Sequence, residues 1–259
     1  MTDFSAEKTP ASAAGTFSPE SGDGKRYRIR AVQSGFGFMT SGKSFFLLRP
    51  GTVILTRPGE KNAFCFLTDA SFPGFEFSGE SAALMKGNAP GFAAGRNIRV
   101  VTSDALDRII RLTDESIAEQ DRHAPGFQLA VLEKLLAAER QVYMHGKDPG
   151  SVEARIAYSL WFITENYVRD ITLKDLSGLT KMSISYYRRT FHRLLGISPI
   201  DCLLDYRLRQ AAGLLAETSL PIGEIAAKTG FNDPNYFSRL FTARKGRPPR
   251  SWRISCRKK

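Results

Sequence analysis

One stretch of sequence occurs twice in the C-terminal part of the chain, and this repeat constrains the fold more than any other feature. Residues 172–182 align with residues 221–231 without a gap, at an offset of 49 residues. Beyond the second stretch the offset becomes 50, which aligns Arg189 with Arg239. Each copy contains a short stretch with one apolar face, a tight turn and a longer amphipathic stretch that ends at glycine. This order predicts two helix-turn-helix units in tandem.

Helix-start signals support both units. In the first copy, Thr172 and Asp175 have the spacing of a capping box, and Ser183 is a favourable N-cap for the longer helix. In the second copy, Asp233 suits an N-cap and Pro234 suits a first helical position. Each unit therefore carries its own local signals for where its helices begin.

The longer helix of each unit has a polar face opposite its apolar stripe. The candidate DNA-contacting residues on these two faces are Ser185, Arg188, Arg189 and His192 in the first copy, and Asn235, Ser238, Arg239 and Thr242 in the second. Hydroxyl, amide and guanidinium groups on an exposed helix are suited to base edges and phosphates. A solvated face of an ordinary amphipathic helix is the alternative for either copy alone. Two matched faces after two matched turns favour DNA binding.

A third helix is predicted between the two units. Ser198-Pro199-Ile200-Asp201 has the order of a cap, a first-turn proline and an early acid, and apolar residues follow at helical spacing as far as about Glu217. A helix of about 18 residues is a rod of about 27 Å. Successive major-groove faces on one side of a duplex are about 34 Å apart. The connector can therefore hold two reading helices about one DNA turn apart.

Further residues at fixed spacings extend this pattern over about a hundred positions. They include Gly196-Ile197-Ser198-Pro199, Gly230-Phe231, Tyr236-Phe237-Ser238, Gly246 and Pro249. With them, residues 152–254 resemble the DNA-binding domain of the AraC/XylS family of bacterial transcription regulators. The resemblance implies about seven helices, two of them in successive major grooves, and base or phosphate contacts for the matched polar residues. Four positions depart from the family pattern. Ser177 and Gly178 stand where a small alanine and a good helix former are usual, Lys181 replaces the common turn glycine, and Pro221 replaces the usual cap.

The positive charge of the chain is concentrated in the same region. Residues 150–259 contain 19 lysines and arginines against 9 aspartates and glutamates, whereas residues 1–149 contain 18 against 17. A basic surface of this kind is expected for phosphate binding. A membrane-binding surface is the competing interpretation. It is disfavoured because the arginines alternate with core-forming aromatic residues rather than facing one broad apolar side.

The N-terminal part has the signals of strands and turns. Six short runs rich in aromatic and β-branched residues are predicted as strands: Tyr27–Val32, Phe36–Met39, Phe45–Leu48, Val53–Thr56, Phe64–Leu67 and Gly74–Phe77. The Pro-Gly pairs at residues 50–51 and 58–59 separate some of them and resemble the turns of the cupin-like sensory domain often joined to this DNA-binding domain. A small antiparallel barrel or sandwich is expected. Two helices follow, at residues 104–121 and about 125–144. They either pack on the sheet as a hairpin or form a dimer seam, and the resemblance favours the seam.

The predicted fold class is therefore α+β, with an N-terminal small antiparallel β barrel (cupin-like) and helical hairpin before an all-α domain. The predicted N-terminal part consists of a disordered arm at 1–24, a β-rich cupin-like regulatory domain at 25–101 and a helical dimerisation region at 102–145. A linker at 146–150 leads to an AraC-type DNA-binding domain at 151–254, and a basic tail follows at 255–259. The helix-turn-helix units of that domain are predicted at about 172–195 and 221–245.

Several kinds of site are disfavoured by the residues present. The three histidines, His123, His145 and His192, lie outside the strand region, so the metal site of an enzymatic cupin is not expected. The Gly35-Phe36-Gly37 stretch is better explained as a hairpin bend than as a nucleotide-binding loop, because a third glycine and a long helix do not follow. We expect no metal, no cofactor and no catalytic residue.

Cysteine usage and hydropathy suggest where the protein works. Cys65, Cys202 and Cys256 are odd in number and far apart, which suggests free thiols in a reducing compartment. The sequence has no run of apolar residues long enough to cross a bilayer and no secretion signal at its start. A cytoplasmic location without membrane binding is therefore expected.

These observations predict a sequence-specific transcription regulator that binds double-stranded promoter DNA, acts with RNA polymerase and forms a homodimer. Its N-terminal domain would sense a signal whose chemistry the sequence does not reveal. One alternative is regulation by a protein partner instead of a small molecule. The other is a repair-type enzyme carrying the same helical unit, which is disfavoured because neither Cys65 nor Cys202 has a neighbouring histidine.

Overall fold

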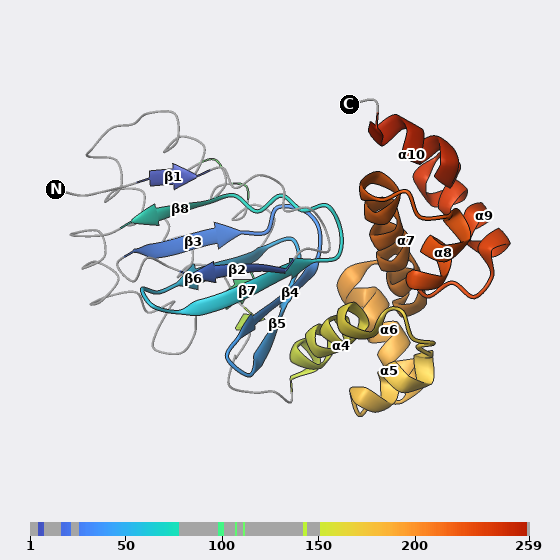
Figure 1. Ribbon diagram of the computed structural model, residues 1–259. Coiled ribbons are helices and arrows are strands. Elements are labelled where there is room, and N and C mark those ends of the chain that lie inside the picture. Colours follow the sequence, from blue (N-terminus) through green and yellow to red (C-terminus); the bar gives the residue numbers. More distant parts are fainter. Residues whose placement is uncertain are drawn as a thin grey trace. The chain divides into compact units, whose positions relative to one another are not determined.

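The computed structural model describes residues 26–77 and 151–257, together with four short strands and the single positions Asp107 and Arg111 outside those ranges. The chain divides into two compact units, residues 1–158 and 159–259 (Figure 1). The boundary between them falls within helix α4 (Val152–Asn166).

The N-terminal unit is built from two antiparallel sheets. The order of strands is β1-β8-β3-β6-β9-β10 in the first sheet and β2-β7-β4-β5 in the second. The strands are β1 (Ser5–Glu7), β2 (Phe17–Ser21), β3 (Tyr27–Ala31), β4 (Gly37–Ser41), β5 (Ser44–Leu48), β6 (Thr52–Thr56), β7 (Lys61–Phe66), β8 (Gly74–Phe77), β9 (Ile98–Val100) and β10 (Val142–Tyr143). The six predicted strands are confirmed as β3 to β8, each within a few residues of its expected bounds.

The turn between β6 and β7 carries the chain from one sheet to the other. Gly59 has a φ of 78°, which is strained for residues other than glycine. The Arg57 backbone N–H donates to a carboxylate oxygen of Glu60 at 3.0 Å, so the turn satisfies its own polar groups. Beyond the turn, the buried rings of Phe64 and Phe66 lie 5.2 and 5.3 Å from the buried ring of Phe72.

Three expectations for this unit need correction or remain untested. The disorder expected for residues 1–24 does not hold for β1 and β2, because unpaired edges of β8 and β7 supply backbone hydrogen bonds whatever the composition of the added strand. Residues 142–143 form β10, where the end of a helix was predicted. The remainder of the predicted helical hairpin and the linker at 146–150 lie outside the described residues, apart from Asp107 and Arg111, which are helical.

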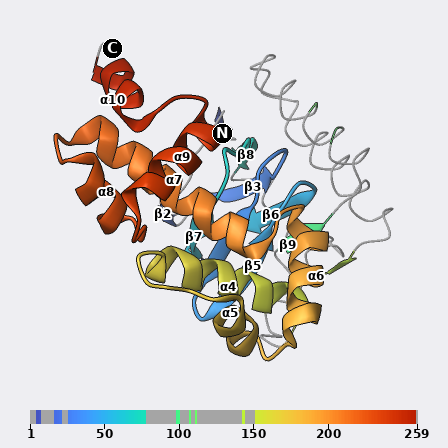
Figure 2. The ribbon, with the colours of Figure 1, turned by 90° about the vertical axis from the view of Figure 1, so that its right-hand side faces the viewer.

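The described residues from 151 onward form seven helices, as predicted, and the first of them, α4, crosses the boundary between the units. They are α4 (Val152–Asn166), α5 (Leu173–Leu179), α6 (Ile184–Leu195), α7 (Pro199–Glu217), α8 (Ile222–Lys228), α9 (Pro234–Lys245) and α10 (Pro249–Arg257). The pairs α5–α6 and α8–α9 are the two helix-turn-helix units, and α7 connects them (Figure 2). With 19 residues, α7 is a rod of about 28 Å.

The two short helices, α5 and α8, end alike but begin differently. Each is followed by a buried threonine, Thr180 or Thr229, whose hydroxyl donates to carbonyls of the last helical turn. At the start of α5, Thr172 and Asp175 form the predicted capping box. At the start of α8, Pro221 forms no side-chain cap and has no backbone N–H for a reciprocal bond. The second unit therefore lacks a stabilising device that the first one has.

The second unit and α7 share one apolar core. Leu208, Ala211 and Leu215 of α7 pack in one buried cluster with residues of α8 and α9. Phe237 and Phe241, both fully buried, supply the α9 side of this cluster, with ring centroids 5.6 Å apart. Burial of these side chains fixes the rotation of α9 about its own axis and hence the direction of its exposed face.

The turns of the two units adopt the same backbone conformation with different residues. Lys181 has a φ of 52°, and Gly230, its counterpart in the repeat, has a φ of 83°. A side chain in this left-handed region costs about 1–2 kcal/mol, and glycine avoids that cost. At position 230 there is also no room, since an added Cβ would lie 2.8 Å from the Tyr167 carbonyl oxygen and 2.9 Å from that of Val168.

We expect Lys181→Gly to stabilise the C-terminal unit by about 1 kcal/mol, because it removes backbone strain at an exposed position. Both tryptophans of the chain, Trp161 and Trp252, belong to this unit. Their fluorescence during urea denaturation therefore reports on this unit alone, and a higher midpoint at unchanged slope is the expected result.

Gly230→Ala is the matched comparison at the equivalent position. It should lower the midpoint strongly, because the new methyl group meets backbone atoms that cannot move aside. A Lys181→Gly protein no more stable than the wild type would show that the lysine conformation is not strained.

Candidate nucleic-acid interface

Helix α6 is oriented by its buried side. Ser183 caps the helix by accepting the Tyr186 backbone N–H, and Gly196 ends it with a φ of 73°. Tyr187 and Phe191 are fully buried, and the Tyr187 hydroxyl donates to the Ser159 hydroxyl of α4 at 3.0 Å. These contacts hold one side of α6 against the domain and leave the opposite side in solvent.

The exposed side of α6 carries the four residues predicted for the first unit. Ser185, Arg188, Arg189 and His192 are all exposed, which places two guanidinium groups, a hydroxyl and an imidazole on one face. Among the described residues, no hydrogen bond or ion pair engages Arg188. The face is thus free to donate hydrogen bonds to an external acceptor.

Helix α9 is oriented in the same way. Asp233 accepts the Asn235 backbone N–H at 2.8 Å, Pro234 occupies the first turn, and Gly246 ends the helix with a φ of 74°. Of the predicted residues, Asn235 and Arg239 are exposed.

The other two predicted residues on α9 have a different environment. Ser238 and Thr242 are half-buried. The Ser238 hydroxyl donates to the Pro234 carbonyl at 2.9 Å, and the Thr242 hydroxyl donates to the Ser238 carbonyl at 2.7 Å. Their protons are therefore engaged within the helix, unlike the polar groups of α6.

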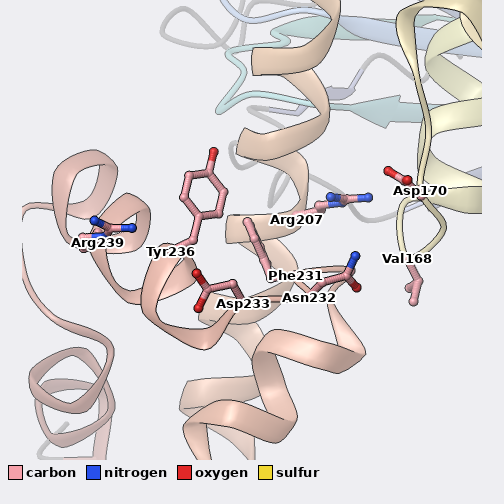
Figure 3. Close-up of a pocket in the computed structure, with 9 residues that line it drawn as sticks. Val168, Asp170, Arg207, Phe231, Asn232, Asp233, Tyr236 and Arg239 are labelled. Carbon is pink, nitrogen blue, oxygen red and sulfur yellow. The ribbon is translucent and has the colours of Figure 1, made fainter.

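An open pocket of about 400 Å³ lies at the start of α9 (Figure 3). It is lined by Val168, Asp170, Arg207, Gly230, Phe231, Asn232, Asp233, Tyr236 and Arg239. The lining combines the loop after α4, the middle of α7 and the turn of the second unit. The pocket therefore borders the predicted DNA-contacting face of α9.

Arg207 joins these three elements. Its Nε donates to the Tyr167 carbonyl and its Nη2 to the Arg169 carbonyl, both at 2.7 Å. The guanidinium carbon is 5.8 Å from the centre of the Phe231 ring. Burial lowers the pKa of the Arg207 side chain, and the negative charge of Asp170 opposes this effect. An arginine remains charged in such a setting and can form strong hydrogen bonds to carbonyl oxygens.

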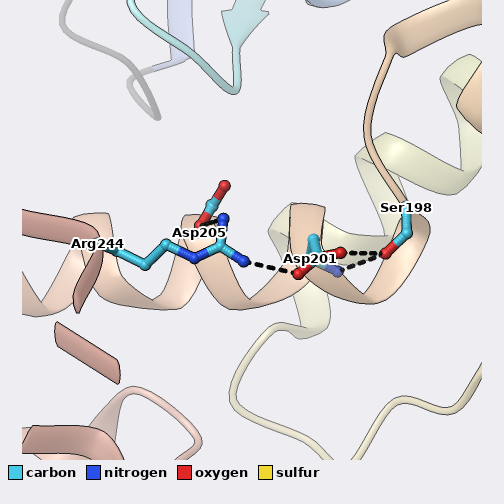
Figure 4. Close-up of polar contacts among 4 residues, drawn as sticks. All are labelled: Ser198, Asp201, Asp205 and Arg244. Carbon is cyan, nitrogen blue, oxygen red and sulfur yellow. Dashed lines mark hydrogen bonds and ion pairs between the residues drawn. The ribbon is translucent and has the colours of Figure 1, made fainter. Parts of the chain in front are cut away.

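A second arginine fixes the other end of α9 on α7 (Figure 4). Arg244 Nη2 lies 2.7 Å from a carboxylate oxygen of Asp201, and its Nη1 lies 3.3 Å from Asp205. The other oxygen of Asp201 accepts the Ser198 hydroxyl at 2.6 Å. The bond from Ser198, with Arg244, holds the pKa of Asp201 below its ordinary value. Arg244 is thus a structural contact between α7 and α9.

Comparison with known proteins identifies this unit. Residues 176–255 match the model of a helix-turn-helix domain family. The chain is 26% identical over 237 residues to the uncharacterized HTH-type transcriptional regulator YdiP of Escherichia coli, covering 86% of this chain and 76% of YdiP. It is 26% identical over 141 residues to the arabinose operon regulatory protein of Escherichia coli, covering 54% of this chain and 48% of that protein. The C-terminal region of this chain is an AraC-type helix-turn-helix domain.

Two further matches cover shorter parts of the chain. The transcriptional activator RhaR of Cronobacter sakazakii is 46% identical over 66 residues, covering 26% of this chain and 23% of that protein. The solved DNA-binding domain of AdpA in complex with a target DNA is 25% identical, with a TM-score of 0.38, and the match covers 40% of this chain and 93% of that one. The chain spans about half or less of the length of the arabinose regulator and of RhaR. The chain is accordingly similar to transcription regulators, and its C-terminal region holds the AraC-type DNA-binding unit.

The roles of Arg207, Tyr186 and Tyr236 beside the candidate interface were not predicted from the sequence. One feature of the sequence could have indicated a buried role for Arg207, since it is the single charged residue on the apolar side of α7 between Leu203 and Ala211. For Tyr186 and Tyr236 the indication was the repeat itself, which places a tyrosine at the same position of both reading helices. Both tyrosines are exposed in the structure.

The described residues contain few groups suited to metal or thiol chemistry. Over this part of the chain, no group of histidine, cysteine and acidic side chains could hold a metal ion. Cys65 and Cys202 are buried and form no disulfide, and burial raises the pKa of the Cys202 thiol above its ordinary value. No described helix is both long and apolar enough to cross a bilayer.

The low pKa of Asp201 predicts an acid-sensitive domain. Because the carboxylate is stabilised in the folded state, its contribution is present above the unfolded pKa of about 3.9 and is lost as pH falls through the lower folded value. We expect Asp201→Asn to be less stable than the wild type at pH 7 and to lose part of the decline in stability between about pH 5 and pH 2. Urea denaturation followed by tryptophan fluorescence across this pH range measures both effects.

The matched control is Asp205→Asn, which removes only the longer contact to Arg244. A pH dependence that is identical in wild type and Asp201→Asn would show that this carboxylate does not contribute.

Proposed function

We propose that this chain regulates transcription by binding specific promoter sequences through α6 and α9, placed in two successive major grooves. The observation that carries the proposal is the pair of exposed polar faces at matching positions of the two repeats. Each face is opposite fully buried aromatic residues, so its direction is set by the core of the domain.

The dimensions of the connector support simultaneous binding. The length of α7, about 28 Å, is close to the 34 Å that separates major-groove faces on one side of B-DNA. Arg207 ties α7 to the turn before α9, and Arg244 ties it to the last turns of α9. This anchoring supports a fixed spacing between the two reading helices.

We assign roles by side-chain chemistry. Arg188 and Arg239 suit the paired acceptors of guanine, and Asn235 suits adenine. Ser185 suits either a base edge or a phosphate, whereas Ser238 and Thr242, whose protons are engaged within α9, suit an amine on a base edge. Arg189, which matches Arg239 in the repeat, suits either a base or a phosphate, and His192, one turn beyond Arg188, suits a phosphate. The excess of basic residues in this half of the chain supports a strong dependence of affinity on salt.

We expect Arg188→Ala and Arg239→Ala each to weaken binding to the operator by about 1–3 kcal/mol and to reduce discrimination against unrelated DNA. The operator would be a duplex recovered from genomic DNA by repeated selection with the wild-type protein. Electrophoretic mobility titrations on this duplex and a scrambled one measure both quantities. An equal loss on the two duplexes would mean that the arginines contact phosphates and not bases.

The rigid connector also predicts a strict operator geometry. Inserting five base pairs between the two half-sites turns them to opposite sides of the duplex, so only one helix can bind and the affinity should fall toward that of a single half-site. An insertion of ten base pairs restores the side but exceeds the length of α7, and should not restore affinity. Full affinity with either insertion would contradict the proposed fixed spacing.

The N-terminal region, residues 25–145, is proposed to control the DNA-binding domain. Its β-rich part would receive the signal, and the helical region at 102–145 would mediate homodimerisation. RNA polymerase is the expected partner at the promoter. The alternative is control by a regulatory protein docked on the same domain. Thermal shifts with metabolite pools and capture of partners from cell extract distinguish these two modes.

A further inference from the structure

Two exposed tyrosines occupy matching positions at the start of α6 and α9. Tyr186 is 39% exposed and Tyr236 is 42% exposed. They are 50 residues apart, the same offset that aligns Arg189 with Arg239. A single exposed tyrosine needs no explanation. The same exposure at the same position of both repeats indicates a contact that the two reading helices share.

The hydroxyl groups of these tyrosines are available for binding. Neither the Tyr186 nor the Tyr236 hydroxyl has a hydrogen-bond partner among the described residues. The neighbouring Tyr187 provides the contrast, because it is fully buried and its hydroxyl donates to Ser159. Adjacent residues of the same type thus differ in role: Tyr187 packs the domain, and Tyr186 faces outward.

Each tyrosine lies one helical turn before an exposed arginine. The Arg189 guanidinium carbon is 5.9 Å from the centre of the Tyr186 ring, and Tyr236 and Arg239 line the same open pocket (Figure 3). At 100° per residue, each tyrosine lies at the edge of its polar face, about 60° beyond the arginine. Side chains at the edge of a helix in the major groove face the phosphates of the groove wall, whereas those at the centre face bases.

The acidic residues near Tyr236 do not prevent its hydroxyl from approaching a phosphate. Asp233 is engaged as the N-cap of α9 through the Asn235 backbone N–H. The charge of Asp170 acts on Arg207. The exposed donors left at this edge of α9 are therefore the Tyr236 hydroxyl and the Arg239 guanidinium.

We propose that Tyr186 and Tyr236 are positioning residues that each donate a phenolic O–H to a DNA backbone phosphate beside Arg189 and Arg239. The inference rests on the proposed DNA-binding function. The two contacts set how deeply each helix enters its groove, and they carry no sequence information of their own.

The test uses Tyr186→Phe, Tyr236→Phe and the double variant in the full chain, because phenylalanine keeps the ring and removes only the hydroxyl. Binding is measured by fluorescence anisotropy on the selected operator and on a scrambled duplex, over a series of salt concentrations. Each single change should raise Kd about five- to tenfold on both duplexes, and the effects should multiply in the double variant. Tyrosine is neutral, so the slope of log Kd against log salt should not change. Arg189→Gln should lower that slope by about one.

Tyr187→Phe is the matched control, since it removes an internally bonded hydroxyl. It should lower the melting temperature and change Kd by less than Tyr186→Phe does, because its hydroxyl faces the interior of the domain. Phosphate ethylation interference supplies a second readout: each Tyr→Phe variant should lose sensitivity at one phosphate near its half-site.

Three results would overturn the proposal: affinities of the Tyr→Phe variants equal to that of the wild type, a loss confined to the operator, or an unchanged interference pattern. The first would leave the tyrosines as a surface for a protein partner, and the second would make them base-reading residues. A wild-type protein that cannot distinguish operator from scrambled DNA would instead contradict the proposed sequence-specific function, whatever the tyrosine variants do.

Discussion

The arrangement of the AraC-type domain depends on one buried cation. The Arg207 guanidinium reaches from the middle of α7 to two carbonyl groups in the loop after α4 and lies beside the aromatic ring in the turn of the second unit. Carbonyls left without a donor in such a place would cost about 1–3 kcal/mol each. Because the same side chain satisfies both, any shift of α7 against α4 or of the second turn against α7 breaks a charged hydrogen bond or a packed contact. The close approach of Gly230 is part of this arrangement, since a side chain there would displace the guanidinium.

The two helix-turn-helix units share a pattern but are stabilised by different means. The first has a capping box at Thr172 and a strained lysine in its turn, whereas the second has no side-chain cap and an unstrained glycine. The second unit makes up for its uncapped start through contacts with α7, namely the shared apolar cluster and the Arg244 ion pairs. The first unit relies more on its own local interactions and on the contact of Tyr187 with α4. Two copies of one sequence pattern are therefore stabilised by different interactions.

The sequence allowed the secondary structure of both described regions to be predicted closely, because local signals decide it. The caps at Ser183, Ser198 and Asp233 and the glycines that end α6 and α9 occur where expected. Features that depend on distant residues could not be predicted. The partners of Arg207 are about 40 positions away in the chain, and the strands of residues 5–7 and 17–21 exist only through pairing with other strands. Of the candidate interface, the sequence predicted two polar helix faces and left out the exposed tyrosines beside them, because tyrosine is assigned to the core unless its exposure is known.

The hydroxyl groups of α9 have a consequence for which base pairs the second half-site can contain. The Ser238 and Thr242 hydroxyls donate to carbonyls of their own helix, so each can only accept a hydrogen bond from DNA. In the major groove, the groups that complement a pure acceptor are the exocyclic amines of adenine and cytosine. Opposite α6, where guanidinium groups dominate, the complement is the acceptor-rich edge of guanine. The two halves of a bound site would then differ in chemical character, and the protein would have a defined direction on the duplex.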